Sequence, residues 1–164
     1  MSVHAHITAS AGRIQSHGGS LRFAPDARYR QAMTSDLLFV YGTLMRGFDH
    51  PMARLLAANA DFISEASCRG RLYLVKHYPG LVLRGDAADI VHGELFRLRE
   101  VDAMLREFDM YEACGEGFPE PTEYVRRQLA VTLADGSMRD AWTYLYNWSV
   151  DDLPRIASGR FLEH

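Results

Sequence analysis

An apolar run that ends in a glycine turn constrains this chain more than any other segment. Residues 37–47 read Leu-Leu-Phe-Val-Tyr-Gly-Thr-Leu-Met-Arg-Gly, which predicts a short strand that breaks at Tyr41-Gly42-Thr43. Such a turn at the mouth of a sheet exposes successive backbone N–H groups that can bind an anion or a developing oxyanion. An ordinary glycine turn after a strand explains the same residues, so the rest of the chain has to decide between a site and a simple turn.

The composition indicates one globular domain and argues against a nucleic acid or membrane partner. Of the 164 residues, 48% are hydrophobic and 24% are charged, which suffices for one buried core. The formal net charge is -3, and no basic stripe is present that would follow a phosphate backbone. No segment approaches the roughly 18 uninterrupted apolar residues of a membrane span, and the N-terminus lacks the apolar core of a signal peptide. We therefore expect a cytoplasmic protein.

The first 35 residues have a different composition. Residues 1–20 are rich in Ser, Gly, His and Ala and lack helical or strand periodicity. We expect residues 1–35 to form a mobile N-terminal extension and residues 36–161 to form the domain. Met33, close before the first strand, would make a natural start, so the leader is interpreted as an upstream extension of the reading frame. A transit peptide is the alternative, which the poor amphipathicity disfavours.

Helices are predicted after the first strand, later in the chain, and briefly at its end. Pro51 suits the first position of a helix, with His50 or Asp49 placed to cap it. Residues 100–108 form the second predicted helix, because their apolar residues have the spacing of one buried face. These apolar residues are Val101, Met104, Leu105 and Phe108.

Further strands are predicted at residues 71–75, 90–98, 124–133 and 138–146. The last two join at Ala134-Asp135-Gly136-Ser137, where Asp-Gly is a strong hairpin signal. Strands dominate and most neighbours look antiparallel. The expected class is therefore α+β rather than a wound parallel sheet.

The motifs that are missing leave carboxylate chemistry as the main candidate. The chain has no closed zinc spacing, no Gly-x-Gly-x-x-Gly, no Gly-rich loop with Lys-Ser or Lys-Thr, and no Gly-x-Ser-x-Gly elbow. We expect neither a metal nor a cofactor, and we expect free thiols at Cys68 and Cys114. Glu112 follows the second predicted helix, where aromatic neighbours can desolvate its carboxylate and raise its pKa toward neutrality. A solvated glutamate at a helix end is the simpler interpretation.

A series of short motifs follows the Tyr41-Gly42-Thr43-Leu44 turn. They are Tyr73, Tyr78-Pro79-Gly80, Val91-His92-Gly93-Glu94-Leu95, Phe108-Asp109-Met110-Tyr111-Glu112, Tyr124-Val125-Arg126-Arg127 and Ala141-Trp142-Thr143-Tyr144. In this order, over residues 36–161, the series resembles the gamma-glutamylcyclotransferase-like superfamily, which includes gamma-glutamylamine cyclotransferase and the avirulence-induced-gene-like proteins. The resemblance implies a small, mixed, mostly antiparallel β-barrel flanked by short helices.

The resemblance assigns the catalytic role to Glu112. Two positions depart from the family motif, because Phe108 replaces the usual Leu and Ala113 replaces the usual Gly. A shifted alignment onto Glu116 is the alternative. Asp109, three residues before Glu112, keeps the internal spacing of the motif, so Glu112 is favoured and Glu116 is expected in a solvated loop.

The resemblance also implies the substrate-binding residues. The backbone N–H groups of Gly42, Thr43 and Leu44 would hold a substrate carboxylate or an oxyanion. Tyr41 would form a wall of the pocket and Tyr124 would supply a polar contact, although a tyrosine in a strand is more often part of the core.

Arg126 and Glu94 have two interpretations each. Arg126 matches the family's Tyr-x-Arg and would pair with a substrate carboxylate or, as we favour, with a structural acid. Glu94 would bind the substrate ammonium from the barrel mouth, or lie on a solvated strand face, which is the simpler account.

The function implied by the resemblance is a gamma-glutamyl cyclotransferase. Glu112 would move a proton while the substrate's alpha-amine attacks its own gamma-carbonyl, which releases 5-oxoproline and a free amine. An amide or ester hydrolase using water at the same site and a non-catalytic small-molecule binding module are the alternatives. The leaving amine stays open among amino acids, polyamines or a lysine side chain, and protected intermediates. We expect a monomer or weak homodimer.

Overall fold

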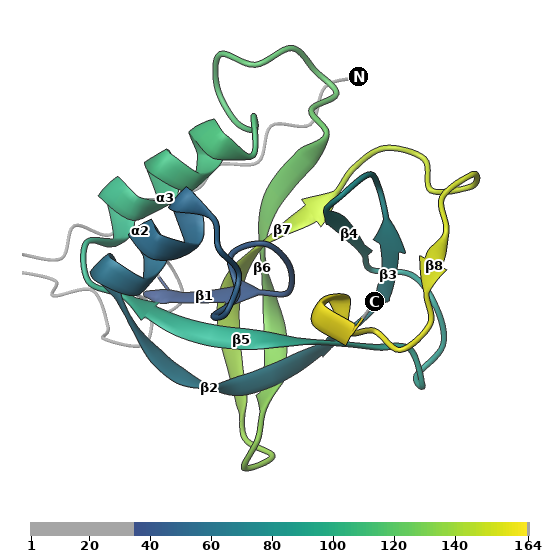
Figure 1. The fold of residues 1–164 in the computed structure, drawn as a ribbon, viewed down its shortest axis with the longest axis horizontal. Helices are drawn as coiled ribbons and strands as arrows, with labels where there is room; N and C mark the ends of the chain where they lie inside the picture. Colours follow the sequence, from purple (N-terminus) through teal and green to yellow (C-terminus); the bar gives the residue numbers. More distant parts are fainter. Residues whose placement is uncertain (1–34, 164) are drawn as a thin grey trace, which may run out of the picture.

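The computed structural model describes residues 35–163, in which a closed β-barrel, a small second sheet and two α-helices are found (Figure 1). The strand order is β1-β5-β2-β6-β7 in the barrel and β4-β3-β8 in the second sheet. The barrel strands are β1 (Leu37–Val40), β2 (Ala60–Arg69), β5 (Ile90–Leu98), β6 (Tyr124–Leu133) and β7 (Met138–Tyr146). The other elements are β3 (Arg71–Leu74), β4 (Pro79–Val82), β8 (Arg155–Ile156), α2 (Pro51–Asn59), α3 (Val101–Tyr111) and the 3-10 helix η1 (Phe161–Glu163). Apart from Ser35, the expected N-terminal extension lies outside the described residues and stays a prediction.

Backbone pairing closes the barrel through a parallel contact. β1 runs antiparallel to β5, with Val40 opposite Glu94, and its other edge meets β7 in parallel at Leu38 and Trp142. β2 pairs with β5 and β6, and β6 pairs with β7, all in the antiparallel sense. The expected α+β class with a mixed, mostly antiparallel barrel is confirmed.

The alternation of side chains along β1 divides the apolar core into two parts. Leu37 and Phe39 belong to a cluster with apolar residues from all five barrel strands, which fills the barrel. Leu38 and Val40 belong to a second cluster on the outer side, which α2 and α3 cover. The α3 members of this outer cluster are Met104, Leu105 and Phe108. The predicted apolar face of the second helix is therefore confirmed.

Both predicted α-helices form, and the second is longer than expected. α2 begins at Pro51, and Nδ1 of the N-cap His50 accepts a hydrogen bond of 3.2 Å from the backbone N–H of Met52. α3 continues past Phe108 to residue 111. Phe108 is the last buried residue of this helix, so the apolar pattern carries no signal for its final residues. Glu112 is consequently the C-cap residue of α3.

Most predicted strands form at the expected residues. The predictions for 90–98, 124–133 and 138–146 match β5, β6 and β7 at both ends, and the strand predicted at 71–75 ends at residue 74. The sequence pattern does not predict β2, β4 or β8. In β2 the register shifts between Phe62 and Ser64, and this irregularity breaks the period of two that would reveal a strand.

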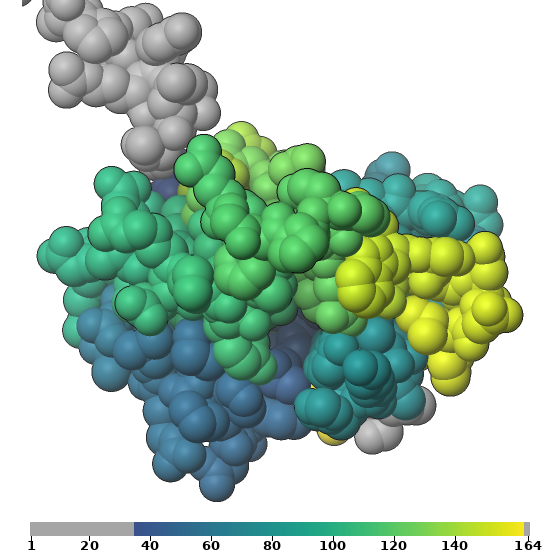
Figure 2. Space-filling model, turned by 90° about the horizontal axis from the view of Figure 1, so that it is seen from above, coloured from purple at the N-terminus to yellow at the C-terminus, as the bar shows by residue number. Residues whose placement is uncertain are grey.

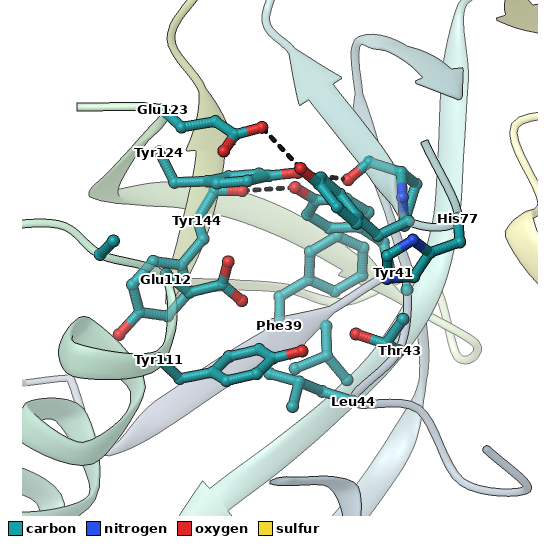
Figure 3. A pocket seen from close by; sticks show the side chains of 15 residues that line it. Phe39, Tyr41, Thr43, Leu44, His77, Tyr111, Glu112, Glu123, Tyr124 and Tyr144 are labelled. Carbon is teal, nitrogen blue, oxygen red and sulfur yellow. Dashed lines mark hydrogen bonds between the residues drawn. The ribbon is translucent and has the colours of Figure 1, made fainter. Parts of the chain in front are cut away.

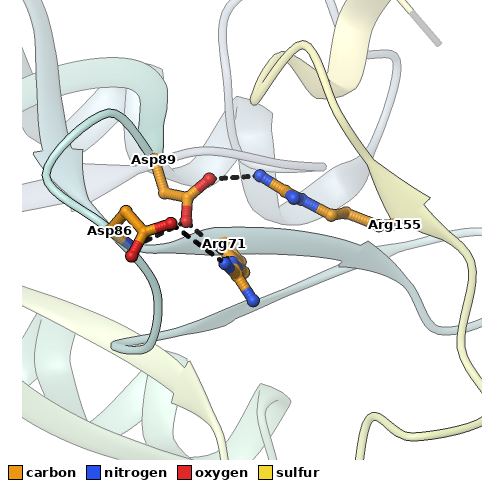
Figure 4. A network of polar contacts seen from close by, with 4 residues as sticks. All are labelled: Arg71, Asp86, Asp89 and Arg155. Atoms are coloured by element: carbon orange, nitrogen blue, oxygen red, sulfur yellow. Dashed lines mark hydrogen bonds and ion pairs between the residues drawn. The ribbon is translucent and has the colours of Figure 1, made fainter.

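An ion-pair network fastens the small sheet beside the barrel (Figure 4). Asp89, just before β5, accepts a hydrogen bond of 2.8 Å from Nε of Arg71 in β3 and another of 2.8 Å from the backbone N–H of Asp86. The same carboxylate pairs with Arg155 of β8. Because Arg71 pairs with Val82 of β4, the network also connects β4, which begins at Pro79, to the segment before β5.

Two further observations concern the described part of the chain. Cys68 and Cys114 are both buried and unpaired, so the expectation of free thiols is confirmed. Neither α-helix within residues 35–163 has the length and apolar content that crossing a bilayer requires.

Gly93 of β5 allows the close approach of β1. A Cβ at Gly93 would overlap the carbonyl oxygen of Val40 and would lie 2.8 Å from Cε2 of Phe39. We expect Gly93→Ala to lower the free energy of unfolding by about 1–3 kcal/mol, because the overlap involves backbone and a packed ring. Urea unfolding of both proteins measures the change, and an unaltered midpoint would show that β1 has room to move.

Candidate active site

A cavity of about 250 Å³ opens at the end of β1. Its walls come from residues 39–44, 77–79, 111–113 and 123–124, with Tyr144 of β7. Figure 2 shows the hollow between a green and a teal surface, with the dark blue of the segment after β1 at its floor. The structure thus brings together every residue predicted for the site, which are Tyr41, Gly42, Thr43, Leu44, Glu112 and Tyr124. Their roles stay predictions.

The turn after β1 packs against β4. A Cβ at Gly42 would lie 2.6 Å from Cγ of Pro79, so a larger residue has no room here. The turn closes with a hydrogen bond of 3.0 Å from the N–H of Met45 to the carbonyl of Gly42. Within residues 35–163, the backbone N–H groups of Gly42, Thr43 and Leu44 donate to no protein acceptor. These three donors belong to residues that line the cavity, and they are therefore available to a ligand.

Glu94 stabilises the same turn from its other side. The residue is 7% exposed; its Oε1 lies 2.9 Å from Nε of Arg46, and its Oε2 accepts a hydrogen bond of 2.8 Å from the Arg46 backbone N–H. The interpretation of Glu94 as a solvated strand residue is wrong. Arg46 reaches Glu94 because the turn folds back toward β5, and strand alternation alone cannot reveal a contact between residues 48 positions apart. Glu94 does not line the cavity.

The end of α3 places Glu112 at the cavity. The N–H of Ala113 donates to the carbonyl of Met110 at 3.3 Å, and the N–H of Cys114 donates to the carbonyl of Asp109 at 2.9 Å. These two bonds form a Schellman motif, in which Glu112 is the C-cap residue. Ala113 follows in the left-handed region, with φ of 48°. The chain therefore leaves the helix axis at once after Glu112.

The Glu112 carboxylate is desolvated and unpaired. It points into the cavity between the rings of Tyr111 and Tyr124 (Figure 3), and no group within the described residues donates a hydrogen bond to it. Burial and, to a smaller extent, the negative charge of Glu123 raise the pKa of Glu112 from its ordinary 4.5 to about 7. Glu112 is thus not a solvated glutamate, whereas Glu116 is exposed, as expected, and does not line the cavity.

Asp109 ties the last turn of α3 to the barrel. Its Oδ1 accepts a hydrogen bond of 2.8 Å from the hydroxyl of Tyr144, and its Oδ2 lies 3.4 Å from Nη2 of Arg126. The Arg126 guanidinium also lies over the ring of Trp142, 4.9 Å from its centroid, and Arg126 does not line the cavity. The structural ion pair favoured for Arg126 is confirmed.

Tyr41 and Tyr124 line the cavity while their hydroxyls bind the backbone. The hydroxyl of Tyr41 donates to the carbonyl of Tyr144 at 2.6 Å and accepts from the N–H of Leu81 at 3.3 Å. The hydroxyl of Tyr124 donates to the carbonyl of Pro79 at 2.8 Å. Burial raises the pKa of both phenols. Tyr41 is thus placed to form a wall of the cavity, as predicted. The Tyr124 hydroxyl, for which a polar contact with substrate is predicted, donates to a protein carbonyl in this structure.

The cavity also contains residues to which the sequence interpretation gives no role. Tyr78, Tyr111, His77 and Glu123 all line it. The hydroxyl of Tyr78 donates to Oε1 of Glu123 at 2.9 Å, and burial, followed by this contact, raises the pKa of Tyr78 to about 12. A partial signal exists in the sequence, because Tyr78 belongs to the motif series and Glu123 directly precedes Tyr124.

Candidate ligands for a metal are few. Among the described residues, no three His, Cys, Asp or Glu side chains gather closely enough to hold a metal ion. The expectation that the site works without metal or cofactor stays a prediction.

Residues 38–163 match the family described as gamma-glutamyl cyclotransferase, AIG2-like. The matched range includes every segment that lines the cavity. The chain belongs to this family. The superfamily resemblance of the motif series is thereby confirmed.

Relatives of this gamma-glutamyl cyclotransferase family member cover most of the described residues. The gamma-glutamylcyclotransferase family protein YtfP of Escherichia coli (strain K12) is 33% identical over 129 residues, which are 77% of this chain and 96% of YtfP. An AIG2-like protein from Mus musculus has a solved structure with a TM-score of 0.57 and 25% identity, over 73% of this chain and 84% of that one. The structure of protein PH0828 from Pyrococcus horikoshii gives a TM-score of 0.54 and 25% identity, over 79% of this chain and 92% of that one.

Ala113 adopts a backbone conformation that glycine tolerates better. The left-handed conformation, with φ of 48°, costs a residue with a Cβ about 1–2 kcal/mol. We expect Ala113→Gly to raise the free energy of unfolding by about 1 kcal/mol. The gain is smaller than the strain that the substitution relieves, because glycine also increases the conformational entropy of the unfolded chain. Denaturant unfolding checks this, and a less stable variant would contradict the strain at Ala113.

The raised pKa of Glu112 predicts a pH-dependent stability. The folded-state pKa of about 7 exceeds the ordinary 4.5, so the protonated carboxyl favours folding, and this contribution is lost as the pH rises through both values. Glu112→Gln stays neutral. Its free energy of unfolding should equal that of the wild type in acid and exceed it by about 3 kcal/mol above pH 7.

Unfolding titrations from about pH 4.5 to about pH 8.5 measure this difference. Glu116→Gln removes the same charge from an exposed position and should follow the wild type throughout. A difference between Glu112→Gln and the wild type that does not change with pH would refute the raised pKa.

Proposed function

We propose that this protein is a gamma-glutamyl cyclotransferase that acts on a gamma-glutamyl amine or gamma-glutamyl amino acid and releases 5-oxoproline. One observation carries the proposal. The unpaired Glu112 carboxylate, with a pKa of about 7, lines the same cavity as the three unpaired N–H groups of the Gly42 to Leu44 turn. A general base near neutrality and a set of oxyanion donors are what an intramolecular acyl transfer requires.

The substrate itself supplies both reacting groups. Its alpha-nitrogen attacks its own gamma-carbon, the bond from the gamma-carbon to the leaving nitrogen breaks, and a five-membered lactam forms. Glu112 takes one proton from the alpha-ammonium before the attack and gives it to the departing nitrogen. The second proton lost from the alpha-nitrogen balances the one that the free amine takes up in water, so no water, oxidant or reductant is consumed.

The turn and the tyrosines hold the folded substrate in this proposal. The N–H groups of Gly42, Thr43 and Leu44 bind the alpha-carboxylate or the tetrahedral oxyanion, and one such donor is typically worth about 3–4 kcal/mol of barrier. Tyr41 and Tyr124 enclose the glutamyl chain with their rings. The small volume of the cavity suits a small ligand rather than a polymer.

Two other functions would use the same residues differently. A hydrolase would direct water to the gamma-carbonyl and release glutamate, so the identity of the product separates it from a cyclotransferase. A binding module would need no base, and the cost of keeping Glu112 desolvated speaks against it. The proposal further includes action in the cytoplasm, without metal or cofactor, as a monomer or weak homodimer.

Glu112→Gln should greatly reduce turnover. The amide keeps the shape of the side chain but accepts no proton, and losing a positioned general base typically costs about 100- to 10,000-fold in rate. The measurement is 5-oxoproline released from a panel of gamma-glutamyl amines and amino acids, with binding to the variant followed by calorimetry. Binding should persist.

Glu116→Gln is the matched control and should keep wild-type turnover, because Glu116 is exposed and outside the cavity. Near-normal 5-oxoproline release by Glu112→Gln, together with its loss in Glu116→Gln, would move the catalytic role to Glu116. Release of glutamate in place of 5-oxoproline would favour the hydrolase.

A further inference from the structure

The cavity carries two carboxylates and no fixed cation. Glu112 and Glu123 both line it, and no Lys or Arg of the described chain does. His77 also lines the cavity. Away from the N–H groups of the Gly42 to Leu44 turn, the electrostatic field of the cavity therefore favours a positively charged ligand group over a negatively charged one.

The proposed reaction accounts for Glu112 and leaves Glu123 without a role. Lactam closure needs one base, because the proton taken from the alpha-ammonium is the proton delivered to the leaving nitrogen. A second carboxylate would also oppose ionisation of the first. Its presence in the cavity therefore calls for a partner of opposite charge in the substrate.

Glu123 is held in position by contacts on its backbone and its side chain. Its carbonyl accepts a hydrogen bond of 2.8 Å from the N–H of Asn147, and its Oε1 accepts one of 2.9 Å from the hydroxyl of Tyr78. Within residues 35–163, no donor pairs with the other oxygen, Oε2. A half-buried carboxylate that is oriented by one bond and keeps one oxygen free can accept a ligand N–H without rearrangement.

Aromatic rings add to the preference for a cation. The ring centroids of Tyr78 and Tyr124 lie 6.4 Å apart, and Figure 3 shows the Tyr124 ring between the Glu112 and Glu123 carboxylates. The faces of such rings attract an ammonium group, whereas a ligand carboxylate in the same place would meet only negative charge.

We propose that Glu123 is a specificity-determining residue that binds a second ammonium group on the leaving amine. The preferred substrates are then mono-gamma-glutamyl diamines, and gamma-glutamyl amino acids, whose leaving amine carries a carboxylate, are disfavoured. This inference rests on the proposed function and narrows it to a substrate class. Glu112 serves the reacting end of the substrate, and Glu123 binds the far end of the leaving group.

Three gamma-glutamyl amides of matched length test the proposal. Their leaving amines, 1,5-diaminopentane, hexylamine and 6-aminohexanoate, share one methylene chain and end in an ammonium, a methyl and a carboxylate group. For the wild type we expect kcat/KM for 5-oxoproline release to be about tenfold higher with the ammonium than with the methyl group, and lowest with the carboxylate. Glu123→Gln should remove this order, so that the three amides react with similar kcat/KM. The loss of the Glu123 charge next to Glu112 changes the rate of all three amides by the same factor, and the ratios between them are therefore the measured quantity.

Two more variants isolate the charge at position 123. Glu123→Asp keeps the charge and should retain part of the preference, and Glu116→Gln, which removes an exposed charge outside the cavity, should retain all of it. A loss by the same factor for all three amides in Glu123→Gln, with the order between them retained, would show that Glu123 acts through the structure of the site, and would overturn the proposal. So would a wild type without charge preference.

Binding separates this inference from the proposed function. Calorimetry with Glu112→Gln and with the Glu112→Gln, Glu123→Gln double variant measures affinity for the three amides without turnover. If the wild type released no 5-oxoproline but Glu112→Gln still bound the diamine amide about tenfold more tightly than the hexyl amide, and the double variant did not, the cation site would stand and the cyclotransferase would fall. Absence of both turnover and charge-dependent binding would overturn both.

Discussion

The burial of Phe108 against the barrel is the constraint on which the site depends. Phe108 is 0% exposed and is the last buried residue of α3, so the packing of α3 against the barrel extends to this residue and ends there. Asp109, the next residue, binds strands β6 and β7 through Arg126 and Tyr144. The Schellman motif then turns the chain away directly after Glu112. Residues that do not react thus set the position of the carboxylate.

The site keeps donors and an acceptor unpaired at a cost to stability. The Glu112 carboxylate has lost most of its water, and the N–H groups of Gly42, Thr43 and Leu44 have no protein partner in the described structure. Unpaired polar groups of this kind are unfavourable until a ligand satisfies them. A molecule with a carboxylate for the turn and an ammonium for Glu112 complements both, and the alpha-carbon head group of a gamma-glutamyl compound carries this pair of charges.

The sequence predicts the local elements well and the long-range contacts poorly. Strands β5, β6 and β7 follow from period-two patterning and from the Asp135-Gly136 hairpin signal, and the start of α2 follows from Pro51. The burial of Glu94 does not, because its partner Arg46 is close only after the turn folds back onto β5. Glu123 is missed for a similar reason. A charged residue before a strand has no periodic signature, and its contact with Tyr78 joins segments 45 positions apart.

Most motif residues of the family maintain the frame of the site and make no free contact in the cavity. Tyr41 and Tyr124 bind backbone carbonyls, Glu94 holds the turn, and Arg126 pairs with Asp109. Within the described residues, the groups left free for a ligand include the Glu112 carboxylate, the turn N–H groups and one oxygen of Glu123. The first two suit the glutamyl part that all substrates of such a reaction share. In the proposed reaction, a choice among leaving amines therefore has to come from residues that the motifs do not specify.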